Sequence, residues 1–273
     1  MSDYLADFPE DVPDQPELVR FERDGDLAIV TLNRPEVMNC LSFPTLKRLR
    51  GLCAEIAADL SIRAVILTGA GEKAFCAGAD LKERKTMPAD RVPHFVKNIR
   101  RTMDDVEALP QPTVAAINGF AFGGGSELLL ACDLRIATAG AQFGLTEVTL
   151  AIIPGAGGTQ RLPRLIGKSR AKDLILTGRR VSAGEAADMG LVNRIAPEGE
   201  LMATAVELAK TIAANGPVAV RAAKAAIDGG AELPLEQGLE YEARCYERTL
   251  TTQDRLEALA AFAEKRKPVY SGS

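Results

Sequence analysis

The sequence has little of the chemistry that most often marks an active site. It has no tryptophan, one histidine (His94) and five cysteines among 273 residues. The cysteines are scattered and form no CxxC pair, so the spacing of a zinc site or a disulfide framework is missing. His94 lies beside Phe95 on an expected amphipathic helix, which favours a packing or surface role over membership of a catalytic triad. We expect no metal site, and carboxylates and backbone amides remain as candidates.

Long apolar runs and a strong excess of one charge are also missing. No stretch approaches the ~18 apolar residues of a membrane span. The net charge of −4 argues against a general nucleic-acid surface. The acidic, proline-rich beginning has neither the apolar core of a signal peptide nor the arginine-rich character of a transit peptide. We therefore expect a soluble, cytoplasmic protein with reduced thiols and no membrane contact.

Short apolar runs alternate with helical patterns over the first 200 residues. Strands are expected at 27–33, 64–67, 113–118 and 134–138. Helices are expected from a Ser42 cap to Leu60, from an Asp80 cap onward, over 92–109, and after the glycines of FGGGSELLLACD. This alternation indicates an α/β fold with a largely parallel sheet and crossover helices.

Alanine-rich helical patterns fill the chain from residue 201 onward. They are broken at Gly216–Pro217, Gly229–Gly230 and Thr251–Thr252. Thr251 and Asp254 resemble a capping box for the last helix. The expected organisation is a flexible acidic lead-in over residues 1–20, an α/β core over 21–200 and a helical region over 201–273. Because no linker separates them, we expect the helical region to pack onto the core.

Two glutamates each follow a glycine-bearing turn. Glu127 stands in GFAFGGGSELLLACD and Glu147 in AQFGLTEVTLAIIPGAGG. Taken singly, the first motif can be a tight turn with an acid in a first helical turn, and Glu147 a solvated surface acid. They are twenty residues apart, so only tertiary structure can bring them together. In one pocket, two carboxylates in different protonation states can divide the proton transfers that add water to a conjugated thioester.

A second glycine-bearing loop, FCAGAD at 75–80, also precedes an expected helix. An amide donor from each loop could converge on one carbonyl oxygen as an oxyanion hole, where each donor contributes about 3–4 kcal/mol. Taken alone, the loop is better read as an ordinary loop and helix cap. Cys76 is a poor candidate nucleophile because no base lies near it in sequence.

Several long segments resemble the crotonase (enoyl-CoA hydratase/isomerase) superfamily. They are KAFCAGADLKE, PTVAAINGFAFGGGSELLLACDLRIA and FGLTEVTLAIIPGAGGTQRLPRLIGKSRAKDLILTG. With AADMGLVNRI and DRLEALAAFAEKRKP, the resemblance covers roughly residues 27–268. It implies a crotonase-like spiral of ββα units with a C-terminal helical region for trimerisation or as a lid. It also implies an acyl-CoA substrate, no cofactor beyond the CoA of that substrate, and a homo-oligomer (a trimer or a dimer of trimers).

The resemblance also carries site residues onto this chain. Glu127 and Glu147 match the two catalytic glutamates of hydratases, and isomerases of the superfamily generally keep only one. This favours a hydro-lyase in which Glu147 protonates the α-carbon and Glu127 is the partner base, with roles that reverse with direction. The oxyanion-hole donors are expected at Ala77 and Gly124. CoA-binding residues are expected at Ala77, Gly78, Ala79, Asp80, Phe262 and Lys265.

Within the superfamily, KAFCAGADLKER and EVTLAIIPG look closest to methylglutaconyl-CoA hydratases of leucine breakdown. Ala151 stands where short-chain crotonases often have glycine. Arg84 or Lys85 could contact the distal carboxylate of that substrate, although a solvated basic helix is the alternative. The main rival function is a general short-chain enoyl-CoA hydratase of fatty-acid β-oxidation, followed by an isomerase.

An RNA-binding protein is a rival from another class, since some methylglutaconyl-CoA hydratases bind AU-rich RNA through a lysine-rich helix. The corresponding helix here carries only Lys47, Arg48 and Arg50 near its start and acids near its end. RNA binding requires a row of phosphate contacts. We therefore do not expect a nucleic-acid partner.

Overall fold

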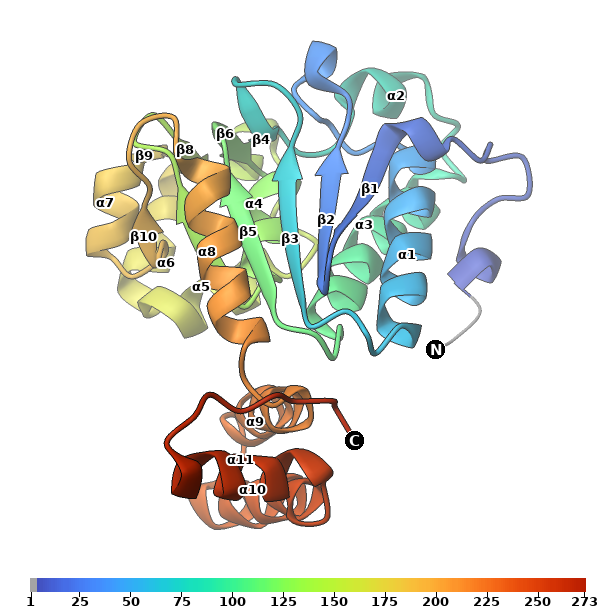
Figure 1. Ribbon diagram of the computed structural model, residues 1–273. Coiled ribbons are helices and arrows are strands. Elements are labelled where there is room, and N and C mark those ends of the chain that lie inside the picture. Colours follow the sequence, from blue (N-terminus) through green and yellow to red (C-terminus); the bar gives the residue numbers. More distant parts are fainter. Residues whose placement is uncertain (1–3) are drawn as a thin grey trace.

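A six-stranded sheet forms the centre of the computed structural model, which describes residues 4–273 (Figure 1). Its order is β1-β2-β3-β5-β7-β10. The strands are β1 (Val19–Asp24), β2 (Leu27–Leu32), β3 (Ala64–Gly69), β5 (Thr113–Ile117), β7 (Leu134–Ala137) and β10 (Arg194–Ile195). Only β1 pairs antiparallel among them. The α/β fold and the parallel sheet expected from the alternating pattern are confirmed.

Alternate residues of the central strands face two separate apolar cores, which is why these strands are continuously apolar. On β3, Val65 and Leu67 join the larger core, whereas Ile66 faces the smaller one. The larger core includes α1 (Phe43–Ala58), α3 (Val92–Glu107) and α4 (Gly124–Leu130). The smaller core is closed by α8 (Leu201–Ala213). The sheet is thus covered on both faces.

A second, smaller sheet positions the glycine loops. Its order is β4-β6-β8-β9, from β4 (Ala74–Cys76), β6 (Phe120–Phe122), β8 (Gln142–Gly144) and β9 (Val181–Ser182). β6 pairs parallel to both β4 and β8, so the carboxyl ends of these three strands share one edge. Strands of three residues leave no readable alternation, and the sequence pattern did not predict them.

The expected helices form with small shifts at their ends. Ser42 caps α1, but α1 ends at Ala58, so Leu60 lies beyond it and is 58% exposed. Asp80 caps α2 (Leu81–Thr86) as expected. The remaining α-helices of the core are α5 (Gly158–Ile166), α6 (Lys168–Thr177) and α7 (Ala183–Asp188), and the 3-10 turns are η1 (Tyr4–Asp7), η2 (Pro16–Leu18), η3 (Pro35–Val37) and η4 (Glu147–Leu150).

The C-terminal helices differ from the expectation that they all pack onto the core. Helix α8 does so, whereas α9 (Pro217–Gly230), α10 (Leu235–Leu250) and α11 (Gln253–Glu264) project away from the sheets (Figure 1). Polar contacts join them to the core: Lys224 of α9 pairs with Asp133, and Arg63 donates to the carbonyl oxygen of Tyr270. Helix α8 therefore belongs with the core, and the projecting part begins at α9.

The cap of α11 also differs by one residue from the expected capping box. The side chain of Thr252, not Thr251, accepts from the Arg255 amide. Asp254 is buried and accepts instead from the amides of Ser271 and Gly272. These bonds tie the end of the chain to the start of α11.

The acidic lead-in is anchored, contrary to the expectation that residues 1–20 are flexible; residues 1–3 lie outside the described part. Phe8 and Val12 are buried in the larger core. Asp7 accepts from Arg50 of α1 at 2.9 Å, and Arg50 also donates to Asp105 of α3 at 2.6 Å. With its side chain 1% exposed, Arg50 joins three segments of the chain.

Over residues 4–273, no helix combines the length and apolarity that crossing a membrane requires.

We expect Arg50→Met to lower the free energy of unfolding by about 3–5 kcal/mol, because it leaves Asp7 and Asp105 without their buried cation. Urea denaturation measures the effect. Arg164→Met is the matched control, since Arg164 pairs with Glu232 while both side chains are more than half exposed; it should change stability by less than about 1 kcal/mol. Equal effects of the two substitutions would contradict this account of Arg50.

Candidate active site

Three loops leave the shared edge of the small sheet: 77–80 after β4, 123–125 after β6 and 145–147 after β8. The first two pack backbone against backbone. Gly78 has φ +97°, and a Cβ there would lie 2.9 Å from the Phe122 carbonyl oxygen. A Cβ at Gly125 would lie 1.9 Å from the Cys76 oxygen. Glycine is therefore required at both positions for the loops to approach this closely.

Glu127 lies in the first turn of α4 and is only 3% exposed. Its Oε1 accepts hydrogen bonds from the amides of Ala156 and Gly158, both at 2.8 Å. Burial raises the pKa of Glu127, although the two amides and the charge of Arg161 act in the opposite direction. The net pKa is raised, but by less than burial alone would raise it, because the donors and the cation favour the carboxylate.

Glu147 begins η4 and reaches the same edge. A Cβ added to Gly123, which has φ +51°, would lie 3.2 Å from Glu147 Oε1, so the carboxyl group sits over the turn that leads into α4. Glu147 Oε2 is buried and has no hydrogen-bond partner in the described part of the chain. Burial, and to a smaller extent the nearby charge of Glu127, raise the pKa of Glu147 to about 7, although a hydrogen bond from its own backbone acts in the opposite direction. The structure therefore brings the two predicted glutamates together.

The two carboxyl groups have unlike surroundings, which suits them to different roles. Glu127 has two amide donors on one oxygen, whereas Glu147 has a buried oxygen without a donor. Carboxyl groups whose environments push their pKa values apart can serve as base and acid in one reaction. The arrangement can therefore accept one proton and deliver another at neighbouring positions.

Two backbone amides near the glutamates are available to a ligand, but one of them is not the amide expected. Gly124 opens α4, and its N–H has no partner among the described residues. The Ala77 N–H instead donates to the Met38 carbonyl oxygen at 3.0 Å. Over the same described range the Ala79 N–H is unpaired, and its nitrogen lies 3.7 Å from where a Cβ would sit on Gly124. The geometry thus replaces Ala77 with Ala79 as the partner of Gly124.

The Ala79 amide is held by contacts that the sequence did not reveal. Leu41 N–H donates to the Gly78 oxygen at 2.8 Å, and Asp80 N–H donates to the Leu41 oxygen at 2.9 Å. These bonds fix both peptides that flank Ala79. Met38, whose φ is +54°, takes the Ala77 amide from the same segment. Only the pairing of 38–41 with 77–80 decides which alanine is left free.

Asp80, expected at the CoA site, is committed to the shape of its loop. Its side chain accepts from the amides of Lys82 and Glu83 and pairs with Arg34 at 2.9 Å. Arg34 also donates to the Cys40 oxygen at 2.7 Å. Sequence reasoning missed Arg34 because its partner is 46 positions away. A ligand along this loop would therefore meet its backbone rather than the Asp80 carboxylate.

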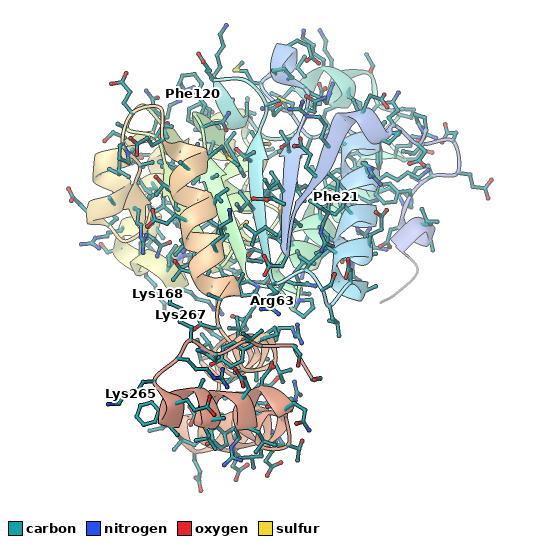
Figure 2. The ribbon with its side chains drawn as sticks, viewed as in Figure 1. Phe21, Arg63, Phe120, Lys168, Lys265 and Lys267 are labelled. Carbon is teal, nitrogen blue, oxygen red and sulfur yellow. The ribbon has the colours of Figure 1, made fainter. Side chains whose placement is uncertain are left out.

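The remaining candidates lie on α2 and α11. Arg84 and Lys85 occupy the last turn of α2, half-buried and exposed respectively. Phe262 is 86% exposed near the end of α11, and Lys265 caps that helix. Figure 2 shows Lys265 at the opposite end of the molecule from Phe120 of β6. One chain therefore does not bring Phe262 and Lys265 to the glycine loops.

Residues 4–273 contain no group of three His, Cys, Asp or Glu side chains arranged to hold a metal ion. His94 lies on α3 and is exposed. The chemistry at the edge is thus that of two carboxyl groups and two free amides.

Comparison with known proteins agrees with this geometry. The family model described as enoyl-CoA hydratase/isomerase matches residues 22–273. A crystal structure of an enoyl-CoA hydratase from Bacillus anthracis superposes with a TM-score of 0.92 at 54% identity, covering 94% of this chain and all of the other.

Two curated relatives are equally similar to the chain. The short-chain-enoyl-CoA hydratase of Clostridium acetobutylicum is 45% identical over 91% of this chain and 95% of its own. The mitochondrial methylglutaconyl-CoA hydratase of Mus musculus is 45% identical over 92% of this chain and 81% of its own.

The raised pKa of Glu147 predicts a pH-dependent stability. Because the folded state favours the protonated acid, that contribution is complete below the ordinary pKa of 4.5 and is lost as the pH rises to about 7. The wild-type protein should therefore lose stability relative to Glu147→Gln between these values and not outside them. Unfolding midpoints of both proteins, measured from pH 4 to pH 8, test this. A constant difference across the range would contradict the burial of an acid at this position.

Proposed function

Because the chain belongs to the enoyl-CoA hydratase/isomerase family, we propose that it is a hydro-lyase that adds water across the α,β double bond of an enoyl-CoA thioester, or removes it. The observation that carries the proposal is the pair of carboxyl groups, Glu127 and Glu147, placed at one edge in unlike surroundings. The reaction draws on no metal or redox cofactor, and CoA arrives as part of the substrate.

In the proposed mechanism, the thioester oxygen binds between the N–H groups of Ala79 and Gly124. Addition at the β-carbon moves negative charge onto this oxygen, where the two amides and the N-terminus of α4 stabilise it. The loops are rigid because their backbones are in contact, so the donors need no reorganisation. The amides thus serve the enolate-like state more than the neutral thioester.

The glutamates supply the protons. Water held between them loses a proton to the Glu127 carboxylate as its oxygen bonds to the β-carbon. Glu147, protonated because of its raised pKa, gives a proton to the α-carbon. The sum is the addition of one water, and the two carboxyl groups together hold one proton before and after. Elimination runs the same steps backwards with the roles exchanged.

An isomerase is the weaker alternative for this site. Moving a double bond needs one acid–base group that takes a proton from one carbon and returns it to another. Here a second carboxyl group lies beside the first and accepts two backbone donors of its own. That second group is what water addition requires.

The finer proposal is that the substrate is 3-methylglutaconyl-CoA and that the enzyme serves leucine breakdown. The two relatives compared above do not separate this from a short-chain hydratase of β-oxidation, since both are 45% identical to the chain. The motif KAFCAGADLKER and Ala151, whose φ is +58°, support the branched, charged substrate. Arg84 is the better placed of the two cations, since it is half-buried one turn after the 77–80 loop.

A homo-oligomer, a trimer or a dimer of trimers, follows from the same proposal. The projecting helices expose apolar side chains that a second copy could cover, among them Leu235, Leu256, Leu259 and Phe262. Lys265 lies far from the glycine loops of its own chain (Figure 2), and Phe262 stands on the same helix end, so their contact with CoA requires the loops of another copy. The cytoplasm is the proposed location, in keeping with the five free cysteines.

Nucleic acid remains outside the proposed partners. The basic side chains of α1 are engaged within the protein: Lys47 donates to the Val12 oxygen, Arg48 pairs with Glu55 and Arg50 is buried. They present no row of free cations to phosphates.

Glu127→Gln and Glu147→Gln should each lower turnover by about 10²–10⁴-fold, because each removes one proton transfer while keeping the shape of the side chain. Loss of the ultraviolet absorbance of the conjugated thioester measures turnover, and calorimetry measures CoA-ester binding, which should persist. Glu185→Gln is the control, since Glu185 lies on α7 and pairs with Arg179. Near-normal turnover of either active-site variant would remove that residue from the mechanism.

The substrate is tested by comparing kcat/KM for 3-methylglutaconyl-CoA and crotonyl-CoA. We expect the first to be preferred. If Arg84 binds the distal carboxylate, Arg84→Gln should reduce that kcat/KM about 10-fold or more, the value of one charged hydrogen bond, and leave crotonyl-CoA within about 2-fold. Lys85→Gln is the matched comparison. A preference for crotonyl-CoA in the wild type would instead assign the enzyme to β-oxidation.

A further inference from the structure

Both amide donors to Glu127 come from one short loop, PGAGG at 154–158. The loop contains three glycines and forms no strand or helix before α5 begins at Gly158. Gly157 has φ +108°, a conformation that glycine favours. Such a loop does not hold two amides on one oxygen unless something else restrains it.

The restraint is the guanidinium of Arg161, one turn into α5. Its NH1 donates to the Ala156 carbonyl oxygen at 3.0 Å. This oxygen lies in the chain between the Ala156 and Gly158 amides that donate to Glu127. A Cβ on Gly157 would lie only 2.0 Å from the same NH1, so the missing side chain is what admits the guanidinium. Arg161 and the loop therefore fit each other closely.

Two acids of α3 hold Arg161 in turn. Its NH2 lies 3.1 Å from Asp104 Oδ1 and 2.5 Å from Glu107 Oε2, and its Nε donates to Glu107 Oε1 at 3.0 Å. The Arg161 side chain is 15% exposed. The side chain is thus fixed along its length by a helix of the larger core, and bidentate pairing of this kind is directional.

We propose that Arg161 is a positioning residue for the hydration reaction: held by Asp104 and Glu107, it fixes the 154–158 loop and through it the carboxylate of Glu127. The inference rests on the proposed role of Glu127. Arg161 itself does not touch the reacting atoms. It acts by keeping the amides of Ala156 and Gly158 on Glu127 Oε1.

The charge of Arg161 acts in the same direction as its geometry. The ionisable groups that interact with Glu127 are Glu147 of η4 and Arg161 of α5. Arg161 is the one cation among them, and it lowers the pKa of Glu127. Its removal takes away both the loop support and this charge, so the pKa of Glu127 should rise.

The test compares Arg161→Gln and Arg161→Lys with Arg164→Gln. Arg164 lies on the same helix and also pairs with a carboxylate, Glu232, but makes no bond to the loop. We expect Arg161→Gln to lower kcat about 10–100-fold with KM changed less than about 2-fold, since displacements near 1 Å cost this much. The acid limb of the pH profile of kcat/KM should move to higher pH. Arg161→Lys keeps the charge but lacks the planar fork, so its kcat should fall with a smaller pH shift.

A double-mutant cycle with Glu127→Gln separates positioning from a general loss of structure. If Arg161 acts through Glu127, adding Arg161→Gln to the Glu127→Gln variant should slow it no further. An equal additional loss in that background would overturn the proposal, as would wild-type kcat and pH profile in Arg161→Gln. Should Arg161→Gln fail to fold, the Arg161→Lys variant carries the same cycle.

Failure of the underlying assignment has a different signature. If Glu127→Gln alone keeps near-normal turnover, Glu127 is not the base, whatever the Arg161 variants do. If Glu127→Gln is slow and the Arg161 variants match Arg164→Gln, only the positioning role is wrong.

Discussion

The site depends on the close burial of one three-residue strand, β4, among glycines of its neighbours. A Cβ at Gly69 would lie 2.4 Å from the Phe75 oxygen, one at Gly119 2.2 Å from the Lys73 oxygen and one at Gly125 1.9 Å from the Cys76 oxygen. No side chain fits at these positions without moving the backbone of β4. Because β4 ends in the 77–80 loop, this contact sets where the Ala79 amide stands relative to Gly124.

Electrostatics at the site follow from that packing. Burial removes most of the ordinary solvation of Glu127 and leaves one oxygen of Glu147 without solvent contact. For Glu127 the fold returns two amide hydrogen bonds, and for Glu147 it returns none to Oε2. The two residues are of the same type, and they differ in how many hydrogen-bond donors the fold gives each carboxyl group. This difference suits one glutamate to act as base and the other as acid.

The features that depend on local sequence patterns could be predicted from the sequence. Strands β2, β3, β5 and β7 are short apolar runs with clear ends, and Glu127 follows glycines that open a helix. The choice between Ala77 and Ala79 could not be predicted, because it depends on a pairing with Leu41 and Met38. The sequence also could not predict that α9–α11 project from the core. An apolar helix face has the same residue pattern whether it packs on its own core or on another molecule.

The buried Glu147 oxygen without a donor has a consequence for how this protein can change over generations. A partly buried acid without a hydrogen-bond donor lowers the free energy of unfolding, and selection keeps it only while catalysis is required. A screen that rewards thermal resistance alone should therefore collect substitutions at Glu147 early. The selected variants would be stable, well folded and inactive. Homologues that no longer catalyse the reaction should lose Glu147 before they lose the glycines around β4.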